Sequence, residues 1–290
     1  MTKYHESVMV KEVLESLHIS NRLHLNKSSQ IIDCTLGTGG HTEAIVKTGV
    51  KVLGIEADPK MLEIAKERLS GTNAKLVLGN FSDLERIAIN NDFKQVDGIL
   101  FDLGVSNLHL KEDDRGFSFS NSEQILDMRL NPEMQGVKAS DLLNALDQTQ
   151  LTHLFEKVLS HNESKRIASR IVTLRPIYKV GELIEVLKDI PHKEKLNPAT
   201  LPMLALRIAV NSELDNLDLS IPKAIGLLKK GGKLLIITFH SGEEKIVQKY
   251  MNARVKIRGL SFAKIRIPSY EEINKNIRSR SAKLYVYTKN

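Results

Sequence analysis

The stretch Ile31-Ile-Asp-Cys-Thr-Leu-Gly-Thr-Gly-Gly-His41 indicates the fold of this 290-residue chain. The two isoleucines begin a short buried strand, and Gly37, Gly39 and Gly40 let the backbone turn tightly and approach a ligand without a Cβ in the way. The next apolar run ends at Glu56, about 20 residues beyond the glycines, where a doubly wound sheet places a carboxylate that accepts hydrogen bonds from ribose hydroxyls. Together these two signals predict a nucleotide-type cofactor site.

The order of the glycines differs from that of a pyrophosphate-binding turn, which follows Gly-x-Gly-x-x-Gly. Here Asp33 stands at the end of the strand, and its carboxylate repels phosphate but suits a cation. S-adenosylmethionine carries a sulfonium and an ammonium group, so the charge favours this cofactor over NAD or FAD. A plain strand-to-helix turn is the alternative that the glycines alone leave open.

The composition limits the class of protein. A hydrophobic content of 41% is enough for a substantial core. No apolar run approaches the roughly 18 residues of a membrane span and no signal-peptide segment opens the chain, so we expect a soluble cytoplasmic protein. Cys34 is the only cysteine and is expected in the core, which excludes an internal disulfide and a thiolate zinc site. The formal charge of +7 permits a nucleic-acid partner.

Alternating apolar runs and helical segments predict an α/β fold with a parallel, Rossmann-like sheet. We expect strands at 31–36, 51–56, 75–79 and 97–102, and helices at 41–48, 59–70 and 83–90. From 108 to 215 the strand signal gives way to helical periodicity, with segments at 139–145, 150–159, 163–174 and 181–187. The expected organisation is therefore a sheet domain made of residues 1–107 and 216–290, with an all-helical subdomain inserted at 108–215.

The C-terminal part of the chain is expected to complete the sheet. The pattern predicts a helix at 221–229, a turn at Gly231-Gly232, a strand at 233–239 and a helix at 242–252. Two further stretches, 262–267 and 282–288, have strand character and are expected to pair as a hairpin-like unit joined by a long loop. No internal repeat is present.

The ends of the predicted strands carry the polar residues expected at the site, because ligands of open α/β sheets bind at the carboxyl ends of the strands. Asp33 and the glycines are expected to hold the methionine part of the cofactor, and Glu56 the ribose. Phe81 would cover an adenine face, although a core aromatic explains it equally well. Asp102 is expected to face the methyl donor and accept an N–H from an amine substrate. Methyl transfer depends on positioning and needs no metal.

Substrate contacts are expected in two other regions. Residues 113–129 mix aromatic, glycine and paired charges, which suits either a substrate-gripping loop or a packed loop with an internal Asp–Arg pair. The stretch from 254 to 283 contains nine basic residues and only two acidic ones, both glutamates. This excess of positive charge suits phosphate contacts of a nucleic acid, or a solvated basic face. The nine are Arg254, Lys256, Arg258, Lys264, Arg266, Lys275, Arg278, Arg280 and Lys283. Among the histidines, His41 and His240 adjoin strand ends.

Motifs spread over nearly the whole chain resemble one family, the bacterial 16S ribosomal RNA (cytosine-N4)-methyltransferases, also called MraW or RsmH. The matching stretches are His5-Glu-Ser-Val-Met9, the stretch 33–41, Asp97-Gly-Ile-Leu-Phe-Asp-Leu-Gly-Val-Ser106, Arg115-Gly-Phe-Ser-Phe119, Leu126-Asp-Met-Arg129, Ala205-Leu-Arg-Ile-Ala-Val-Asn211, Phe239-His-Ser241 and Arg278-Ser-Arg-Ser-Ala-Lys283. So many ordered matches are highly specific. The resemblance implies a class I methyltransferase sheet with a helical insertion that recognises the substrate.

The resemblance also implies a role for individual residues. S-adenosylmethionine is expected to lie against Gly39, Gly40, His41, Glu56, Phe81 and Asp102, and Asp33, Gly37 and His109 complete the expected cofactor set. The acceptor is the exocyclic amine of a cytidine in 16S ribosomal RNA of the small subunit. Asp102 is the expected catalytic residue, because a hydrogen bond to the amine localises its lone pair. The expected substrate contacts are Arg115, Arg129, Arg207, Asn211, His240, Arg278 and Arg280.

Three segments depart from the usual motifs of that family. Residues 105–109 are Val-Ser-Asn-Leu-His in place of Val-Ser-Ser-Pro-Gln, so His109 replaces a cofactor-contacting glutamine. Residues 201–204 are Leu-Pro-Met-Leu in place of Arg-Thr-Phe-Gln, which removes a cation and a phenyl ring near the expected RNA face. Residues 242–244 are Gly-Glu-Glu in place of Leu-Glu-Asp. We expect cofactor binding to tolerate these changes.

Two other functions stay open on the sequence alone. One is a methyltransferase that acts on DNA or on a small molecule, and the other is a noncatalytic S-adenosylmethionine-binding factor of ribosome assembly. The basic stretch 254–283 and the helical insertion favour a large anionic substrate, whereas the altered 105–109 segment leaves the noncatalytic function open. The sequence does not indicate whether the protein is a monomer or a homodimer, or whether naked RNA or an assembled subunit is the substrate.

Overall fold

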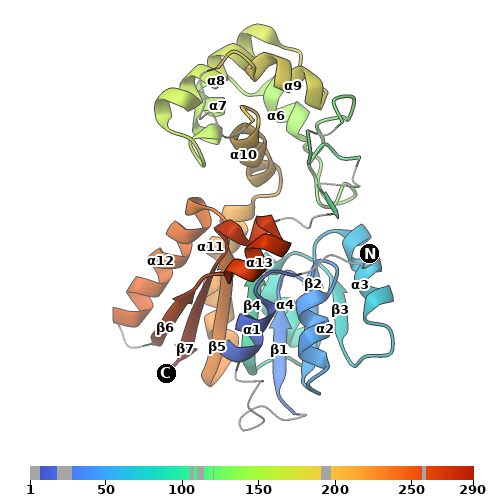
Figure 1. The fold of residues 1–290 in the computed structure, drawn as a ribbon, viewed down its shortest axis with the longest axis vertical. Helices are drawn as coiled ribbons and strands as arrows, with labels where there is room; N and C mark the ends of the chain where they lie inside the picture. The colour runs from blue at the N-terminus through green and yellow to red at the C-terminus, as the bar shows by residue number, and fades with distance from the viewer. Residues whose placement is uncertain are drawn as a thin grey trace. The chain divides into compact units, whose positions relative to one another are not determined.

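A computed structural model describes residues 7–17, 28–104, 108–109, 114–119, 121–190, 197–256 and 259–290. The chain divides into two compact units. The first, which we call the sheet unit, consists of Met1–Gly104 and Leu214–Asn290, and the second, the helical unit, consists of Val105–Glu213. Each unit is described by itself (Figure 1).

The sheet unit is built on one sheet, which has seven strands within the described residues. They are β1 (Gln30–Asp33), β2 (Lys51–Glu56), β3 (Lys75–Leu78), β4 (Val96–Asp102), β5 (Leu228–Thr238), β6 (Leu260–Arg266) and β7 (Lys283–Lys289), in the order β3-β2-β1-β4-β5-β7-β6. The strands from β3 to β5 are parallel, and β7 runs antiparallel to both β5 and β6. The predicted α/β fold with a mainly parallel sheet is confirmed.

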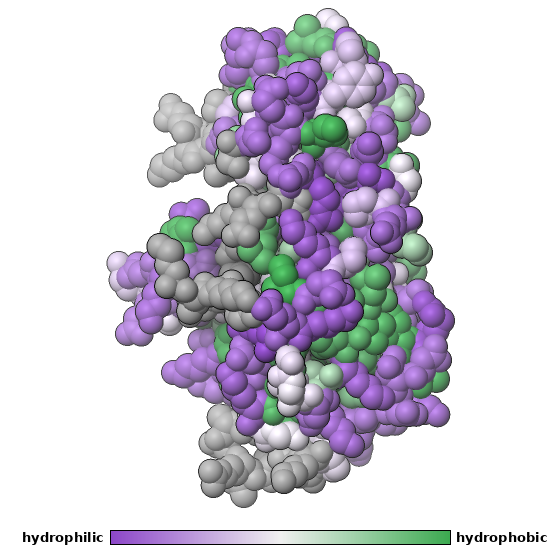
Figure 2. Space-filling view, turned by 90° about the vertical axis from the view of Figure 1, so that its right-hand side faces the viewer, coloured by the Kyte–Doolittle hydropathy of each residue, from purple (hydrophilic) through white to green (hydrophobic). Residues whose placement is uncertain are grey.

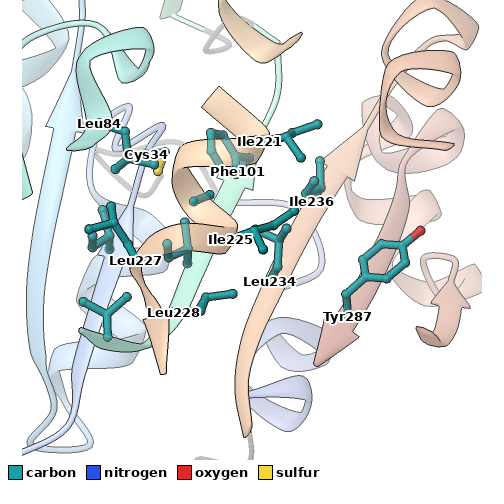
Figure 3. Close-up of a cluster of buried hydrophobic side chains, with 14 of the residues drawn as sticks. Cys34, Leu84, Phe101, Ile221, Ile225, Leu227, Leu228, Leu234, Ile236 and Tyr287 are labelled. Carbon is teal, nitrogen blue, oxygen red and sulfur yellow. The ribbon is translucent and has the colours of Figure 1, made fainter. Parts of the chain in front are cut away.

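Helices cover both faces of this sheet, as a parallel sheet requires. One face packs against α1 (Val10–Ser16), α2 (Gly40–Val46) and α3 (Pro59–Arg68). The other packs against α4 (Leu84–Asn90), α11 (Glu213–Leu227) and α12 (Ser241–Lys256). In this second core, Phe101 and Ile236 of the strands face Ile221 and Ile225 of α11 (Figure 3). Cys34 is buried in the same cluster, as predicted, and burial raises the pKa of its thiol.

The sequence misplaced the start of β5. Strand β5 begins at Leu228, so the predicted helix at 221–229 ends too late and the predicted turn at Gly231-Gly232 lies inside a strand. Leu228 pairs with Val96 and Lys233 with Gly98, so the residues between form a bulge that Gly231 accommodates at φ +80°. The predicted pairing of the last two stretches is confirmed by β6 and β7, but α13 (Tyr270–Lys275) and η2 (Ile277–Ser281) replace the expected loop.

The helical unit has its own apolar core. Its described helices include α6 (Ala139–Ala145), α7 (Gln148–Phe155), α8 (His161–Leu174), α9 (Val180–Leu187) and α10 (Thr200–Val210). Asp147 caps α7 and Ser160 caps α8, each in a capping box that satisfies free N–H groups of the first turn. Large side chains such as Phe155 are fully buried between these helices. The unit can therefore hold its shape on internal contacts.

The face seen in Figure 2 is mainly hydrophilic, with one broader hydrophobic area toward the lower right and smaller ones elsewhere. Single exposed apolar side chains such as Leu78 and Ile89, at 47% and 44% exposure, are ordinary on a protein surface. No helix in the described part of the chain is long and apolar enough to span a bilayer.

Candidate functional site

The carboxyl ends of three adjacent parallel strands bring three carboxylates to one edge of the sheet. Asp33 ends β1, Glu56 ends β2 and Asp102 ends β4. Because β1 lies between β2 and β4 in register, these residues are neighbours in space although the chain separates them. Helix α2 starts directly above this edge, after the glycine turn. The edge is the candidate site.

The glycine turn has a backbone that side chains would disrupt. Gly37 and Gly39 have φ angles of +53° and +85°, in the left-handed region that favours glycine. A Cβ at Gly39 would lie 2.9 Å from Leu69 Cδ1, and one at Gly40 would lie 2.1 Å from Ser7 Oγ. A Cβ at Gly37 would meet only the Thr35 carbonyl, at 4.0 Å. The turn is thus packed beneath Gly39 and Gly40 and open at Gly37.

Glu56 is tied to this turn and remains capable of binding a ligand. Its Oε2 accepts the N–H of Gly37 at 2.7 Å, and its Oε1 accepts the N–H of Asp58 at 2.8 Å. Burial raises the pKa of Glu56 to about 7, and the backbone donors offset only part of that rise. A carboxylate has roughly four acceptor positions, so the two backbone bonds leave others for hydroxyl groups.

Asp33 is fully buried and already has partners. Its carboxylate accepts the hydroxyl of Thr42 at 2.8 Å and the N–H of Thr35 at 3.3 Å. Burial raises its pKa, against the lowering effect of nearby His41. Asp33 therefore ties β1 to the first turn of α2, and its predicted contact with the cofactor stays a prediction.

His41 and Asp102 form the most unusual pair at the site. His41 Nε2 lies 3.3 Å from Asp102 Oδ2, and the side chains are 4% and 21% exposed. Both imidazole nitrogens and Asp102 Oδ1 are buried without a hydrogen-bond partner among the described residues. The backbone N–H of Asp102 donates to Thr35 Oγ1 at 2.6 Å, which fixes the end of β4 to the glycine turn. Polar atoms left free at a fixed strand end can bind a ligand.

Phe81 lies in η1 (Phe81–Asp83), directly after β3, and packs partly into the core. Its ring meets Phe101 edge to face, with the ring centres 5.6 Å apart, and its carbonyl accepts the hydroxyl of Ser220 at 2.9 Å. Asn80 caps η1 by accepting the N–H of Ser82. The ring is only partly buried, so these packing contacts leave some of its surface for an adenine.

His240 follows β5 at the same edge of the sheet. Its Nδ1 accepts the N–H of Gly242, and its Nε2 lies 3.2 Å from Glu243 Oε1. Glu243 Oε2 in turn accepts the N–H groups of Phe239 and His240. The local bonds therefore orient His240 at the start of α12.

The predicted basic stretch 254–283 keeps fewer free cations than the sequence suggests. The side chains of Arg254, Lys256, Arg258 and Lys264 lie outside the described residues. Of the remaining five, Arg266 pairs with Glu15 and Lys283 pairs with Glu244. Lys275, Arg278 and Arg280 are exposed. Within the described side chains, these three carry the charge that is available for phosphate groups.

The predicted substrate residues of the helical unit form bonds within that unit. Arg115 donates to the carbonyls of Arg129 and Leu130, and Arg129 forms a bidentate pair with Asp127. Arg207 forms another bidentate pair with Glu213, at 2.8 and 2.9 Å. These bonds favour the packed-loop interpretation of 113–129, and the expected RNA contacts of these arginines stay predictions.

Asn211 and His109 are buried in the helical unit. Asn211 donates to the carbonyls of Met128 and Arg207 and accepts the N–H of Leu130. His109 packs against Phe117, with the ring centres 5.0 Å apart. The expected contact of His109 with the cofactor would join the two units, so it stays a prediction. Other residues of the 105–109 segment lie outside the described part.

Several residues of the site were not singled out from the sequence. Thr35 and Thr42 stand within and directly after the glycine stretch, and their hydroxyls bind Asp102 and Asp33. Their position inside the motif was a signal that could have marked them. Glu272 lies in α13, far along the chain, and accepts the N–H of Met9 at 2.6 Å. No local pattern indicates that it approaches His41.

The chain was compared with protein families and with known proteins. The model of the MraW methylase family matches residues 2–290. A ribosomal RNA small subunit methyltransferase H from Methylacidiphilum infernorum is 39% identical, over 97% of this chain and 93% of that protein. The protein of the same name from Coprothermobacter proteolyticus is 37% identical, over 100% of this chain and 98% of that protein.

Solved structures are more distant. An rRNA methylase from Streptococcus thermophilus has 13% sequence identity and a TM-score of 0.48, over 99% of both chains. That likeness is too low to support an argument about function. The match of the family model over nearly the full length, together with the curated relatives, is decisive, and this chain belongs to the MraW methylase family.

Proposed function

We propose that this protein transfers a methyl group to the exocyclic N4 amine of a cytidine in 16S ribosomal RNA of the small subunit. The names of the curated relatives, ribosomal RNA small subunit methyltransferase H, support a ribosomal RNA substrate. The observation that carries the proposal is the position of Asp102, a partly exposed carboxylate at a fixed strand end beside the glycine turn. A cytoplasmic location is part of the same proposal.

S-adenosylmethionine is the cofactor, and it supplies an electrophilic methyl group on a sulfonium when bound. The residues at the strand ends fit this molecule. The backbone is open at Gly37, and Glu56 has free acceptor positions for hydroxyl groups. Asp102 and His41 offer buried polar atoms that lack partners among the described residues. The three carboxylates favour a cationic ligand over a pyrophosphate.

Asp102 would act on the acceptor. The exocyclic amine of cytosine is a poor nucleophile, because its lone pair is delocalised into the ring. A carboxylate that accepts one N–H draws electron density back to the nitrogen and orients the lone pair toward the methyl carbon. Such positioning supplies much of the acceleration of an in-line displacement. A carboxylate at a fixed strand end is suited to this role.

RNA contacts are proposed on both units. In the sheet unit, Arg278 and Arg280 are exposed on η2. In the helical unit, a groove of about 800 Å³ along α8 is lined by Lys165, Arg166 and Arg170, by Asp189, which pairs with Arg170, and by hydroxyl and amide side chains. Lys165 and Arg166 form no ion pair within the described residues. The helical unit has 14 basic and 15 acidic side chains overall, so the groove concentrates positive charge on a unit that has no excess of it.

The direct test is transfer of a labelled methyl group. Purified protein is incubated with labelled S-adenosylmethionine and small ribosomal subunits that lack the modification. We expect label in the RNA and its loss in Asp102→Ala, measured at a concentration of S-adenosylmethionine that saturates each protein. Cofactor binding by the wild type without any transfer would support a noncatalytic factor of ribosome assembly. Label in DNA or in a small amine, but not in RNA, would support a methyltransferase with one of those substrates.

A further inference from the structure

His41 is enclosed by three carboxylates that come from three other elements. They are Asp33 of β1, Asp102 of β4 and Glu272 of α13, and each acts electrostatically on the imidazole. The ring is 4% exposed. Ser7 lies against the neighbouring Gly40, and Glu272 accepts the N–H of Met9. The imidazole is thus shut off from solvent in an acidic environment.

Among the described residues, the imidazole has one polar side chain in direct reach, Asp102, whereas its other acidic neighbours are largely engaged elsewhere. Asp33 accepts two hydrogen bonds, and Glu272 accepts one from Met9. Neither nitrogen of His41 has a hydrogen-bond partner among the described residues, although Nε2 lies 3.3 Å from Asp102 Oδ2. Buried polar groups in folded proteins are almost always paired, so an exception needs an explanation. His41 Nε2 faces Asp102 at a distance slightly longer than a normal hydrogen bond, and Nδ1 has no partner among the described residues, so the ring is held close to Asp102 without a full set of bonds.

We propose that His41 positions Asp102 and, through it, takes up the proton that the substrate amine loses on methylation. This inference rests on the proposed function, because it names the path of the proton in that reaction. His41 acts here on Asp102 and does not touch the substrate amine. It is therefore a positioning residue, and Asp102 remains the catalytic one.

The proton balance is complete with these two side chains. The N4 lone pair forms a bond to the methyl carbon while the carbon–sulfur bond breaks and its electron pair stays on sulfur. The nitrogen then carries one proton too many, which passes to Asp102 Oδ2. Neutral His41 accepts that proton on Nε2 and becomes an imidazolium, and Asp102 is again a carboxylate. The proton leaves to solvent after the product departs.

The surroundings favour a proton on His41. Burial alone would lower the pKa of His41, but Asp102, Asp33 and Glu272 raise it above its ordinary value. Among the described residues, the other charged groups near the ring are Arg68, whose Nη1 lies close to Gly40, and Glu43, with which Arg68 is paired. That pair is close to neutral, so the three carboxylates determine the field at the ring. The imidazolium is the charge that they stabilise.

The first test needs neither cofactor nor RNA. The ring of His41 is titrated by NMR in the full-length protein and in Asp102→Asn, which keeps the shape of the side chain but removes its charge. We expect the pKa of His41 to fall in the variant, because the charge of Asp102 is one of the causes that raise it. The signal of His153, an exposed histidine of the helical unit, is followed in the same spectra as the internal control. An unchanged His41 would overturn the proposed coupling.

The second test uses the rate of transfer. Single-turnover methylation is followed from pH 5.5 to 9 at saturating S-adenosylmethionine, in wild type, His41→Gln and His153→Gln. Glutamine can still donate to Asp102 but does not titrate. We expect the wild-type rate to rise with pH as His41 loses its proton, and His41→Gln to be about 100-fold slower and to lack that rise. His153→Gln, a surface variant outside the site, is expected to keep both the rate and its rise with pH.

The outcomes distinguish this inference from the proposed function. A wild-type protein that transfers no methyl group to RNA would refute the function and leave the NMR result to stand alone. Normal transfer with the full pH dependence retained in His41→Gln would overturn the inference and leave the function intact. A variant that lost cofactor affinity in proportion to its rate would also overturn it, since His41 would then serve binding alone.

Discussion

The two units of this protein differ in where their charged groups find partners. The sheet unit has 28 basic and 20 acidic side chains, and the helical unit has 14 and 15. The site of the sheet unit nevertheless consists of buried acids and an imidazole, with polar atoms left unpaired among the described residues. In the helical unit, Arg115, Arg129 and Arg207 are bound to neighbouring groups of the same unit. Buried polar atoms without a partner in the described part of the chain also occur in the helical unit, at Ser164 Oγ and Arg175 Nε, so the site is distinguished by the meeting of such atoms at adjacent strand ends. The arginines alone are not a reliable guide to it.

The largest expected effect is the fall in the methyl-transfer rate when Asp102 is replaced. Asp102→Asn removes the charge that orients the amine and accepts its proton, so we expect the single-turnover rate to fall by about 100- to 1000-fold. Cofactor affinity, measured by calorimetry, is expected to change far less. Arg129→Lys in the helical unit is the matched control, and an equal loss of rate in that variant would remove the proposed contrast between the units.

The next largest effect is on stability and tests whether Asn211 has a structural role in the helical unit. Asn211→Ala leaves the Leu130 N–H and the Met128 and Arg207 carbonyls without their partner, so we expect a loss of about 2 to 3 kcal/mol of local stability. Hydrogen exchange resolves the two units and is expected to show faster exchange in the helical unit alone. Unchanged exchange with lost RNA affinity would instead make Asn211 a substrate contact.

Glu56 provides a test by pH. Its pKa is raised to about 7 in the folded protein, so between about pH 4.5 and 7 the folded state holds a proton that the unfolded state has lost. Stability is therefore expected to decrease as the pH rises through this range, by about 3 kcal/mol. Urea unfolding of wild type and Glu56→Gln measures the difference, and the variant should lack this part of the pH dependence. If the contribution of Glu56 to the free energy of unfolding increased with pH instead, its pKa would be lowered on folding, which would contradict the raised pKa.

The smallest expected effect concerns the groove of the helical unit. Replacing Lys165 and Arg166 by glutamate should weaken binding to the small subunit by about tenfold and reduce the salt dependence by about two counterions. Cofactor binding should stay unchanged. A double variant of Lys138 and Lys157, which do not line the groove, is the control. Equal weakening in both double variants would mean that only the overall charge matters.

Much of the fold follows from sequence because its signals are local. The alternation of apolar runs and helical segments placed β2 at its observed ends, and the glycines with Glu56 indicated the cofactor edge. Pro59 was expected in the first turn of a helix and stands at its first position, after the cap Asp58. The bulge at 229–232 was missed because two glycines also suit a turn, and only pairing with β4 shows which is formed.

The arrangement of the site depends on contacts between distant segments, which a single sequence does not contain. The approach of Glu272 to His41 joins α13 to α2, and the Asp33–Thr42 bond depends on how α2 starts. Met128 has a φ of +60°, which the local sequence does not predict. The buried Asn211 stabilises this backbone by donating to the Met128 carbonyl. The ion pairs of Arg129 with Asp127 and of Arg207 with Glu213 likewise become visible only in the folded helical unit.

The central claim is that this site methylates the N4 amine of a cytidine in ribosomal RNA. It is tested most directly by digesting small-subunit RNA after incubation with the protein and S-adenosylmethionine, and identifying the modified nucleoside by mass spectrometry against standards. We predict N4-methylcytidine, formed by wild type and absent with Asp102→Asn. A methyl group on a ring atom, on the ribose or on another base would contradict the claim, as would unmodified RNA.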